Sequence, residues 1–506
     1  MAPASAFNHF PSTHFLLQPS HNTLLNNFSS FPRFSRIVPP FWSFSVTASD
    51  NPRPSGGRQA INHSANRART TSPKSSKPKS SHGTSRRSAL KKTFRQEQVS
   101  FANRVPDDPV VGIIGGGMSG LVCALYLDKR GIPSTVFDSG IHGLGGRMGT
   151  RIIDPQSLIF DHAAQFFTVN DPSFSELVND WSNRGLVEQW HGTIGELQNG
   201  GIFTPFPSSS PPRYIGVNGM RPLADSILSQ TSLVKVVRPC WISALDPYNG
   251  TWHLSENGKS CGHFDAVVIA HNGKCANRLL ASSGLPIIAR QMKRLKLSSI
   301  WALLTTFEDP LPIANADFAS FEGAFVKGVD SVSWMANNTK KLSGFKTIGP
   351  HCWTILSTAA FGMQNKVPQE SIPTDTAVKV KETMLEGVEK ALGLPHRSLK
   401  SPSYTRLQLW GAALPTNTPS IPCIFDPYGR AGVCGDWLLG SSLEAAALSG
   451  MALANHIADY MQSGGERPEG FAAGLHDEFE SIDGHDIGQF SHLEPNGHIE
   501  NSFVPL

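Results

Sequence analysis

The chain has 506 residues, enough for two or three domains, and a formal net charge of +4 at pH 7. Residues 1–96 hold fourteen Lys or Arg and one acidic residue, whereas residues 97–506 hold thirty basic and thirty-nine acidic residues. The body is therefore acidic, and the basic pI of 8.6 comes from the N-terminal segment. The pI is thus no argument for a nucleic-acid partner. No run of about eighteen apolar residues occurs, which excludes a transmembrane segment but not peripheral membrane contact.

The N-terminal segment has the composition of a targeting sequence. Residues 1–96 are rich in Ser, Pro, Asn and Arg, and Asp50 is the only acidic residue among them. This composition predicts a chloroplast or mitochondrial transit peptide, and the abundance of Ser and Pro favours the chloroplast stroma over the mitochondrion. A processing site is expected near residues 46–49, and residues 49–107 are expected to form a disordered basic linker. The alternative is a disordered N-terminus without a targeting signal.

A nucleotide-binding pattern begins at residue 110. Residues 110–114 (VVGII) form an apolar run typical of a buried parallel strand, and residues 115–120 (GGGMSG) match G-x-G-x-x-G. A helical pattern follows over 121–129, and a second strand, 134–137, ends at Asp138. This order predicts a Rossmann-type site, in which the Asp138 carboxylate accepts hydrogen bonds from ribose hydroxyls.

Three positions of this loop require glycine, each for a different physical reason. Gly115 allows the tight turn, Gly117 lets the backbone approach a pyrophosphate, and Gly120 lets the helix lie against the strand. The helix N-terminus at Met118 and Ser119 offers N–H groups and partial positive charge to the phosphates. These residues are therefore candidate cofactor ligands.

A second glycine-rich segment, GGRMGTR, occupies residues 145–151. Gly145 and Gly146 would bring the backbone close to a ligand, and Arg147 would offer a forked contact to phosphate. The alternative is a glycine-rich surface turn with a solvated arginine.

This segment and four later runs resemble the flavin-containing amine oxidase superfamily, and most closely its renalase-like branch of plant and bacterial NAD/FAD-dependent oxidoreductases. The runs are FDHAAQFFT at 160–168, YIGVNGM at 214–220, FDAVVIA at 264–270, and GVCGDW at 432–437 with SSLEAAALSG at 441–450. The resemblance spans about residues 108–462. It implies FAD as cofactor, and non-covalent binding, because no Cys occupies the position at which monoamine oxidases attach flavin.

The last run is the C-terminal cofactor element. Residues 441–444 (SSLE) read as a capping box, with Ser441 as the cap of a helix from Leu443 to about Met461. The resemblance implies that the positive end of this helix faces the flavin N1–C2=O edge and that Asp436 contacts the ribityl–pyrophosphate region. The cofactor-binding candidates from this element are Gly435, Asp436, Ser442, Leu443 and Glu444.

These features predict an α/β protein with a discontinuous, glutathione-reductase-like Rossmann FAD-binding domain and a substrate lobe on a mostly antiparallel sheet. We expect the FAD-binding domain to comprise 108–155, 215–285 and 405–462, the lobe 156–214 and 286–404, and a solvated acidic tail 463–506. Within them, 234–270 predicts a meander with a hairpin turn at Asn257-Gly258, 301–307 a strand and 374–392 a helix.

Catalytic residues are harder to name, because a flavin supplies the chemistry of hydride transfer itself. Gln165 is the one catalytic candidate, and Phe166 and Phe167 are expected near the flavin, the alternative being a buried amide among core rings. Arg406 and Trp410 could line the substrate side, but packing is the favoured role, because a large aromatic residue in a long chain usually belongs to the core. Seven scattered cysteines without CxxC predict neither a disulfide framework nor a metal site.

Three functions follow. The first is an FAD-dependent oxidoreductase that accepts a hydride from a small reduced donor, a dihydronicotinamide isomer or an amine, and passes electrons to O₂ or another acceptor. The expected partners are then a small-molecule substrate and an NAD(P)-type donor. The second is a plastid isoprenoid, carotenoid or tetrapyrrole desaturase or dehydrogenase. The third is a flavin-stabilised assembly factor without turnover, since fold and cofactor do not fix function.

Overall fold

The computed structural model describes residues 97–482 except 156, 315–319 and 344–348. All of these residues belong to one compact unit of the chain, residues 83–506. The predicted transit peptide, the linker up to residue 96 and residues 483–506 lie outside the described residues.

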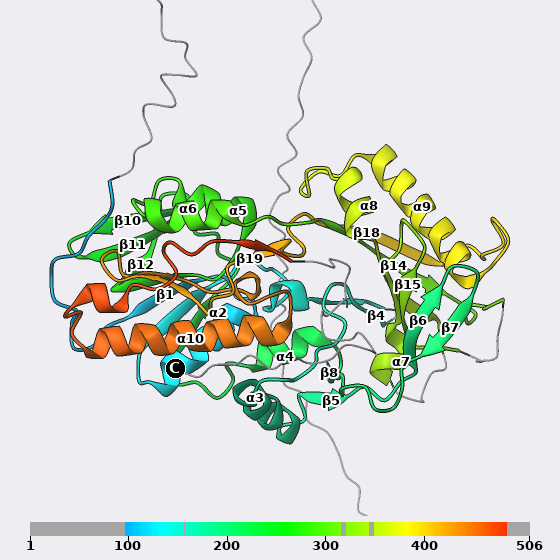
Figure 1. Cartoon of the computed structure of the whole chain (residues 1–506), viewed down its shortest axis with the longest axis horizontal. Coiled ribbons are helices and arrows are strands. Elements are labelled where there is room, and N and C mark those ends of the chain that lie inside the picture. The colour runs from blue at the N-terminus through cyan, green and yellow to red at the C-terminus, as the bar shows by residue number, and fades with distance from the viewer. Residues whose placement is uncertain (1–96, 156, 315–319, 344–348, 483–506) are drawn as a thin grey trace, which may run out of the picture. The chain divides into compact units, whose positions relative to one another are not determined.

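A six-stranded, mostly parallel sheet forms the centre of the first domain (Figure 1). In spatial order its strands are β20 (Ile424–Asp426), β21 (Ala431–Val433), β13 (Ala266–Ile269), β1 (Val111–Ile114), β2 (Ser134–Phe137) and β9 (Val234–Val237). Only β20 runs antiparallel to its neighbour. All four residues of β1 are buried, as its continuous apolar sequence predicts for a strand covered on both faces. This domain is called the dinucleotide domain below.

Helices cover one face of this sheet, and a small second sheet covers the other. Helices α2 (Met118–Lys129) and α10 (Leu443–Gln462) pack on the face that carries Val111 and Ile113. On the opposite face lie the meander β10 (Ala244–Tyr248), β11 (Thr251–Glu256) and β12 (Lys259–Phe264), with helices α5 (Gly273–Leu280) and α6 (Pro286–Arg294). The N-terminal ends of α2 and α10 both reach the same cavity.

A seven-stranded sheet forms the lobe. In spatial order it contains β18 (Tyr404–Trp410), β14 (Ile300–Phe307), β17 (His351–Leu356), β16 (Trp334–Asn337), β15 (Gly323–Lys327), β6 (Ile194–Gln198) and β7 (Ile202–Pro205). Every pairing except β15 with β6 is antiparallel. Helices α8 (Ala359–Gln364) and α9 (Thr374–Leu392) pack on one face. The other face presents Ile300 and Leu356 to the cavity.

Shorter elements connect the two sheets. They are the pair β3 (Thr150–Ile153) and β4 (Leu158–Asp161), the pair β5 (Val187–Gln189) and β8 (Tyr214–Gly216), and helices α3 (Pro172–Asn183), α4 (Met220–Ser226) and α7 (Asn338–Ser343). Helix α3 shares a core cluster with α2 and α10. Although its sequence lies in a segment assigned to the lobe, it therefore packs on the dinucleotide domain.

Several local predictions are confirmed. Strand β14 and helix α9 match the predicted strand 301–307 and helix 374–392, and the helix ends at Gly393, whose φ of 69° is left-handed. Asn257 and Gly258 both have positive φ and turn β11 into β12, as a tight hairpin requires. A second turn of this meander, Asn249-Gly250, joins β10 to β11, and both of its residues have positive φ.

Three boundary predictions need correction. Residues 97–107, expected as disordered linker, bond to the body through Val99 to Gly284 and Phe101 to Tyr428. Residues 463–482, expected as solvated tail, also pack on it, with Phe479 stacked on Trp437 at 6.0 Å. The predicted boundary at 405 falls inside β18, which pairs with β14 and so belongs to the lobe. Composition cannot reveal such contacts, because a few apolar residues anchor each otherwise polar segment.

Candidate cofactor and substrate cavity

A cavity of about 1140 Å³ lies between the dinucleotide domain and the lobe. The two glycine-rich segments, the Gly435-Asp436 turn and the start of α10 line it from one side, and the lobe sheet lines it from the other. Sites for one drug-sized ligand commonly measure roughly 300–1,000 Å³. The volume therefore suits an extended dinucleotide together with a small substrate.

The three glycines of the first loop meet different surroundings. A Cβ on Gly115, which has φ of 121°, would lie 2.7 Å from the Ala270 carbonyl oxygen, and a Cβ on Gly120 would lie 2.0 Å from that of Gly115. A Cβ on Gly117 would meet nothing within 4 Å, and Gly117 lines the cavity. Gly115 and Gly120 are thus required by the protein's own packing, whereas Gly117 leaves space beside the backbone that a phosphate group can use.

Helix α2 begins at this loop. Met118 and Ser119 form its first turn and line the cavity, and no acidic residue lies in that turn. The first N–H groups of a helix lack partners within the helix and carry partial positive charge. This helix end can therefore bind an anion.

Asp138 lies beside the glycine loop at the end of β2. Its Oδ2 accepts from the Gly116 N–H at 2.8 Å and its Oδ1 from the Gly140 N–H at 2.7 Å, and the residue lines the cavity. Each carboxylate oxygen has a second lone pair for a hydroxyl donor. The position fits the predicted contact with a ribose, and the two bonds hold the carboxylate against the loop.

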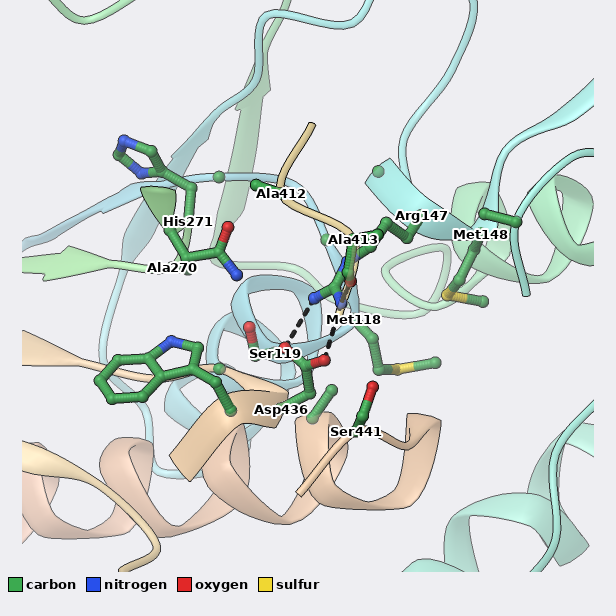
Figure 2. Close-up of a pocket in the computed structure, with 18 of the residues that line it drawn as sticks. Met118, Ser119, Arg147, Met148, Ala270, His271, Ala412, Ala413, Asp436 and Ser441 are labelled. Atoms are coloured by element: carbon green, nitrogen blue, oxygen red, sulfur yellow. Dashed lines mark hydrogen bonds and ion pairs between the residues drawn. The ribbon is translucent and has the colours of Figure 1, made fainter. Parts of the chain in front are cut away.

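Arg147 differs from the free fork to phosphate that its sequence suggested. Figure 2 shows it reaching towards Asp436, with N–O distances of 2.6 and 2.8 Å, and it also donates to the Ala413 carbonyl at 2.7 Å. Partial burial alone lowers the pKa of the guanidinium, but the charge of Asp436 and their hydrogen bonds leave this pKa above its ordinary value. The pair joins the two predicted cofactor segments across the cavity.

The C-terminal element also departs from its prediction. Ser442, not Ser441, caps α10 by accepting from the Ala445 N–H at 2.9 Å. Glu444 does not close a capping box; it accepts from the backbone N–H groups of Asn170 at 2.6 Å and Asp171 at 3.3 Å. The glutamate therefore holds a neighbouring loop. Gly435, Asp436, Ser442, Leu443 and Glu444 all line the cavity.

Gln165 lines the cavity, but its amide points back into its own turn. Its Nε2 donates to the carbonyls of Asp161 at 2.8 Å and Ala163 at 3.0 Å, while Oε1 is buried without a hydrogen-bond partner. Both amide hydrogens are thus committed to backbone, so a role as a donor to substrate would require rearrangement. Phe166 and Phe167 follow it on the cavity wall, and Phe167 is also part of the core.

Trp410 and Arg406 take different positions. Trp410 lines the cavity, donates to the His162 carbonyl at 3.0 Å and stacks on the His162 ring at 5.5 Å. Burial, followed by the charge of Arg151, lowers the pKa of His162 to about 4, so the ring is neutral at pH 7. Arg406 is exposed and does not line the cavity.

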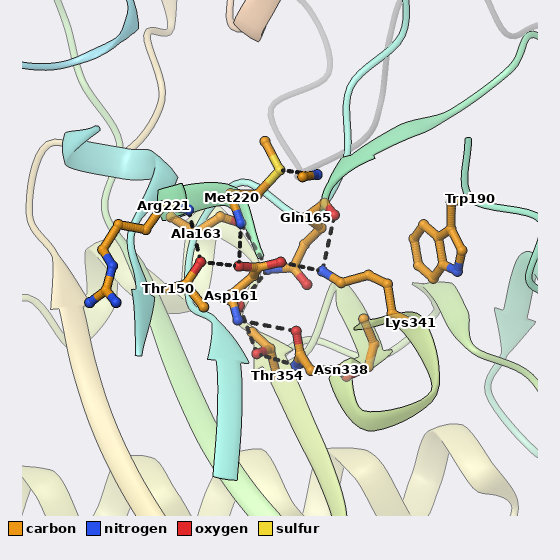
Figure 3. A network of polar contacts seen from close by, with 12 residues as sticks. Thr150, Asp161, Ala163, Gln165, Trp190, Met220, Arg221, Asn338, Lys341 and Thr354 are labelled. Atoms are coloured by element: carbon orange, nitrogen blue, oxygen red, sulfur yellow. Dashed lines mark hydrogen bonds and ion pairs between the residues drawn. The ribbon is translucent and has the colours of Figure 1, made fainter. Parts of the chain in front are cut away.

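Sequence reasoning missed part of the lobe side of the cavity and a buried ion pair. Ile300, Leu356 and Gln369 come from separate strands and a loop, and no motif marks them. Lys341 forms an ion pair with Asp161 inside the protein, at 2.7 Å (Figure 3). Asp161 belongs to a run with family resemblance, but a single lysine in a short helix gives no signal of its own.

In the described part of the chain, no group of three or more His, Cys, Asp or Glu side chains is placed to hold a metal ion. No helix among the described residues of 97–482 is both long enough and apolar enough to cross a bilayer.

Comparisons with known proteins agree with this architecture. A family model described as an NAD(P)-binding Rossmann-like domain matches residues 113–181. The chain is similar to a putative protoporphyrinogen oxidase from Exiguobacterium sp. 255-15, with a TM-score of 0.52 and 11% identity over 70% of this chain and 99% of that one. It is similar to reduced UDP-galactopyranose mutase, with a TM-score of 0.52 and 10% identity over 72% and 98%.

A third solved structure shares the fold. Cyclohexylamine oxidase from Brevibacterium oxydans IH-35A aligns with a TM-score of 0.50 and 12% identity, over 70% of this chain and 100% of that one. At such identities the likeness establishes a common α/β fold with a Rossmann-like domain. It leaves the substrate to be argued from the site.

Proposed function

We propose that the chain is an FAD-dependent oxidoreductase of the renalase-like branch of the flavin-containing amine oxidase superfamily. It would accept a hydride from a small uncharged donor, a dihydronicotinamide isomer or an unprotonated amine, and pass electrons to O₂ or another acceptor. One observation carries the choice of donor: of the described residues that the lobe contributes to the cavity, none is charged. A charged donor would lose its hydration there without gaining a partner.

The residues at the cavity fit a non-covalently bound FAD. The open space at Gly117 and the first turn of α2 would receive the pyrophosphate, and Asp138 would receive a ribose. The N-terminal end of α10, capped by Ser442, supplies partial positive charge to the part of the cavity that it lines. When bound, the flavin supplies hydride and electron transfer.

The protein's own contribution is position and exclusion of water. Phe166, Ile300, Leu356 and Trp410 form an apolar compartment on the lobe side. Trp410 is held by its stack and hydrogen bond to His162, which favours one orientation of the indole. A flat, uncharged donor can lie against such a rigid aromatic wall with little loss of entropy on the protein's side.

Anaerobic mixing of the yellow protein with a panel of donors tests this function. We expect dihydronicotinamide isomers or small cyclic amines, the amines faster above their own pKa, to bleach the visible band of the oxidised flavin most rapidly. The reason is that the neutral compartment favours the uncharged form of the donor. Bleaching by a carotenoid or porphyrinogen alone would favour a desaturase or dehydrogenase. No bleaching by any donor, with FAD bound, would favour an assembly factor.

We further propose that the mature protein works in the chloroplast stroma, on the strength of the Ser- and Pro-rich, acid-poor composition of residues 1–48. A fluorescent protein fused behind residues 1–96 should enter plastids, and the same fusion without residues 1–48 should stay in the cytosol. Mitochondrial import of the first fusion would contradict the proposal.

A further inference from the structure

We propose that Lys341 is a positioning residue, which holds one wall of the cavity in place through a fully buried ion pair. The wall segment is residues 163–168, all of which line the cavity. Lys341 itself does not line it. The inference assumes that the cavity receives a ligand, as the proposed function requires, but it does not depend on which donor is used.

The ion pair joins two regions far apart in sequence. Lys341, in α7, donates from Nζ to Asp161 Oδ2 at 2.7 Å, and both side chains are 0% exposed. Asp161 is the last residue of β4 and lies just before the wall segment. The Lys341 ammonium also lies 5.7 Å from the centre of the Trp190 ring, which offers a favourable face to a cation.

Asp161 has several hydrogen-bond partners besides Lys341, as Figure 3 shows. Its Oδ1 accepts from the Thr150 hydroxyl at 2.5 Å and the Met220 N–H at 3.0 Å. Its backbone N–H donates to Asn338 Oδ1 at 3.1 Å, and its carbonyl accepts from the Thr354 hydroxyl at 2.8 Å. Lys341 therefore adds the counter-charge to a carboxylate whose position other groups already set.

The second bond of Lys341 reaches the wall itself. Its Nζ donates to the Gln165 carbonyl at 3.1 Å. Backbone hydrogen bonds fix the wall on either side of this point, from the Ala164 N–H to Arg147 and between Phe167 and Tyr214. Between these two anchors, Lys341 ties the Gln165–Phe166 peptide to the lobe. Loss of this tie should loosen the part of the wall that carries the Phe166 ring.

The effect of the ion pair on stability can be measured separately from its effect on the position of the wall. The reason is that removing one partner of a buried pair costs more stability than removing both. Lys341→Met leaves the Asp161 carboxylate buried without a counter-charge, which is strongly destabilising. The double variant Asp161→Asn/Lys341→Met removes both charges, and the amide oxygen of the introduced asparagine can keep the bonds from Thr150 and Met220. Replacing a whole buried pair by neutral groups is often nearly neutral for stability. The tie to the Gln165 carbonyl is lost in both variants.

The test compares these variants with the wild type by thermal unfolding and by hydrogen exchange of the wall amides without added cofactor. We expect Lys341→Met to lower Tm by about 5 °C and the double variant to regain most of that loss. In both, residues 163–168 should exchange roughly tenfold faster, as expected when a local tie is lost. FAD affinity should fall several-fold in the double variant. Lys400→Met, which breaks an exposed ion pair to Asp309 of the same 2.7 Å length, should change none of these quantities.

Wild-type exchange of residues 163–168 in the double variant would overturn the proposal, because the pair would then serve stability alone. An unchanged Tm in Lys341→Met would overturn it too, since the pair would not be formed. Failure of the double variant to fold would also count against it, because the pair would then be a requirement of the whole fold. Hydrogen exchange is measured without flavin. A wild type that binds no FAD would therefore contradict the proposed function, but the exchange rates would still test the role of Lys341.

Discussion

Gly117→Val should give a folded protein that binds no FAD. A side chain on Gly117 meets no protein atom within 4 Å, so the fold can accept it, but it would occupy the cavity space assigned to the pyrophosphate. We expect a Tm within about 2 °C of the wild-type apoprotein and at least roughly a thousandfold loss of FAD affinity, which corresponds to about 4 kcal/mol. Flavin fluorescence titration and thermal unfolding measure the two quantities.

Gly470→Val is the matched control for this substitution. A Cβ on Gly470 also meets nothing within 4 Å, and Gly470 does not line the cavity. This variant should bind FAD like the wild type. Wild-type FAD affinity in Gly117→Val would show that the pyrophosphate lies elsewhere, and the assignment of the glycine loop would be wrong.

Gly120→Ala should have the opposite signature, because it damages the fold before it affects the ligand. A Cβ there would lie 2.0 Å from the Gly115 carbonyl oxygen and 3.0 Å from the Ala270 Cβ, so α2 would have to move away from the glycine loop and β13. Backbone cannot rotate out of such a contact as a side chain can, and we expect a loss of at least about 3 kcal/mol in the free energy of unfolding. Denaturant unfolding of the apoprotein measures it.

Gly117→Val serves as the control for Gly120→Ala. If this variant unfolds like the wild type while losing FAD, Gly120 serves the ligand and not the packing of α2. If both glycine variants unfold early, the open space at Gly117 is not real. The two glycines stand three residues apart in one motif, so opposite outcomes would separate the two reasons for glycine in it.

Local patterns predicted the parts of the fold that local chemistry determines. The strand, loop, helix and second strand from Val111 to Phe137 form as expected, because buried apolar runs and glycines with special backbone conformations restrict each step. The lobe's β14 and helix α9 follow from length and periodicity in the same way. For these segments, the observed secondary structure agrees with the prediction, and the glycine loop lines the cavity as expected.

The remaining features depend on contacts between distant residues. Arg147 pairs with Asp436, 289 positions away, and Glu444 holds Asn170, 274 positions away. The sequence shows that Arg147 has a guanidinium group and that Glu444 lies near a helix start. It does not show which groups in the folded protein form hydrogen bonds with them. The same holds for Lys341, whose partner Asp161 is 180 positions away. The ion pair forms only when α7 and β4 are brought together by the fold.

Flavin analysis of the purified wild-type protein tests whether the cavity holds FAD without a covalent bond. We expect a yellow protein with one FAD per chain, and release of the flavin into the supernatant on acid precipitation, because backbone, helix ends and carboxylates hold it without a covalent bond. Chromatography and mass measurement of the supernatant should identify FAD. A colourless protein that takes up no FAD on incubation, or a flavin that stays with the pellet, would contradict non-covalent FAD binding.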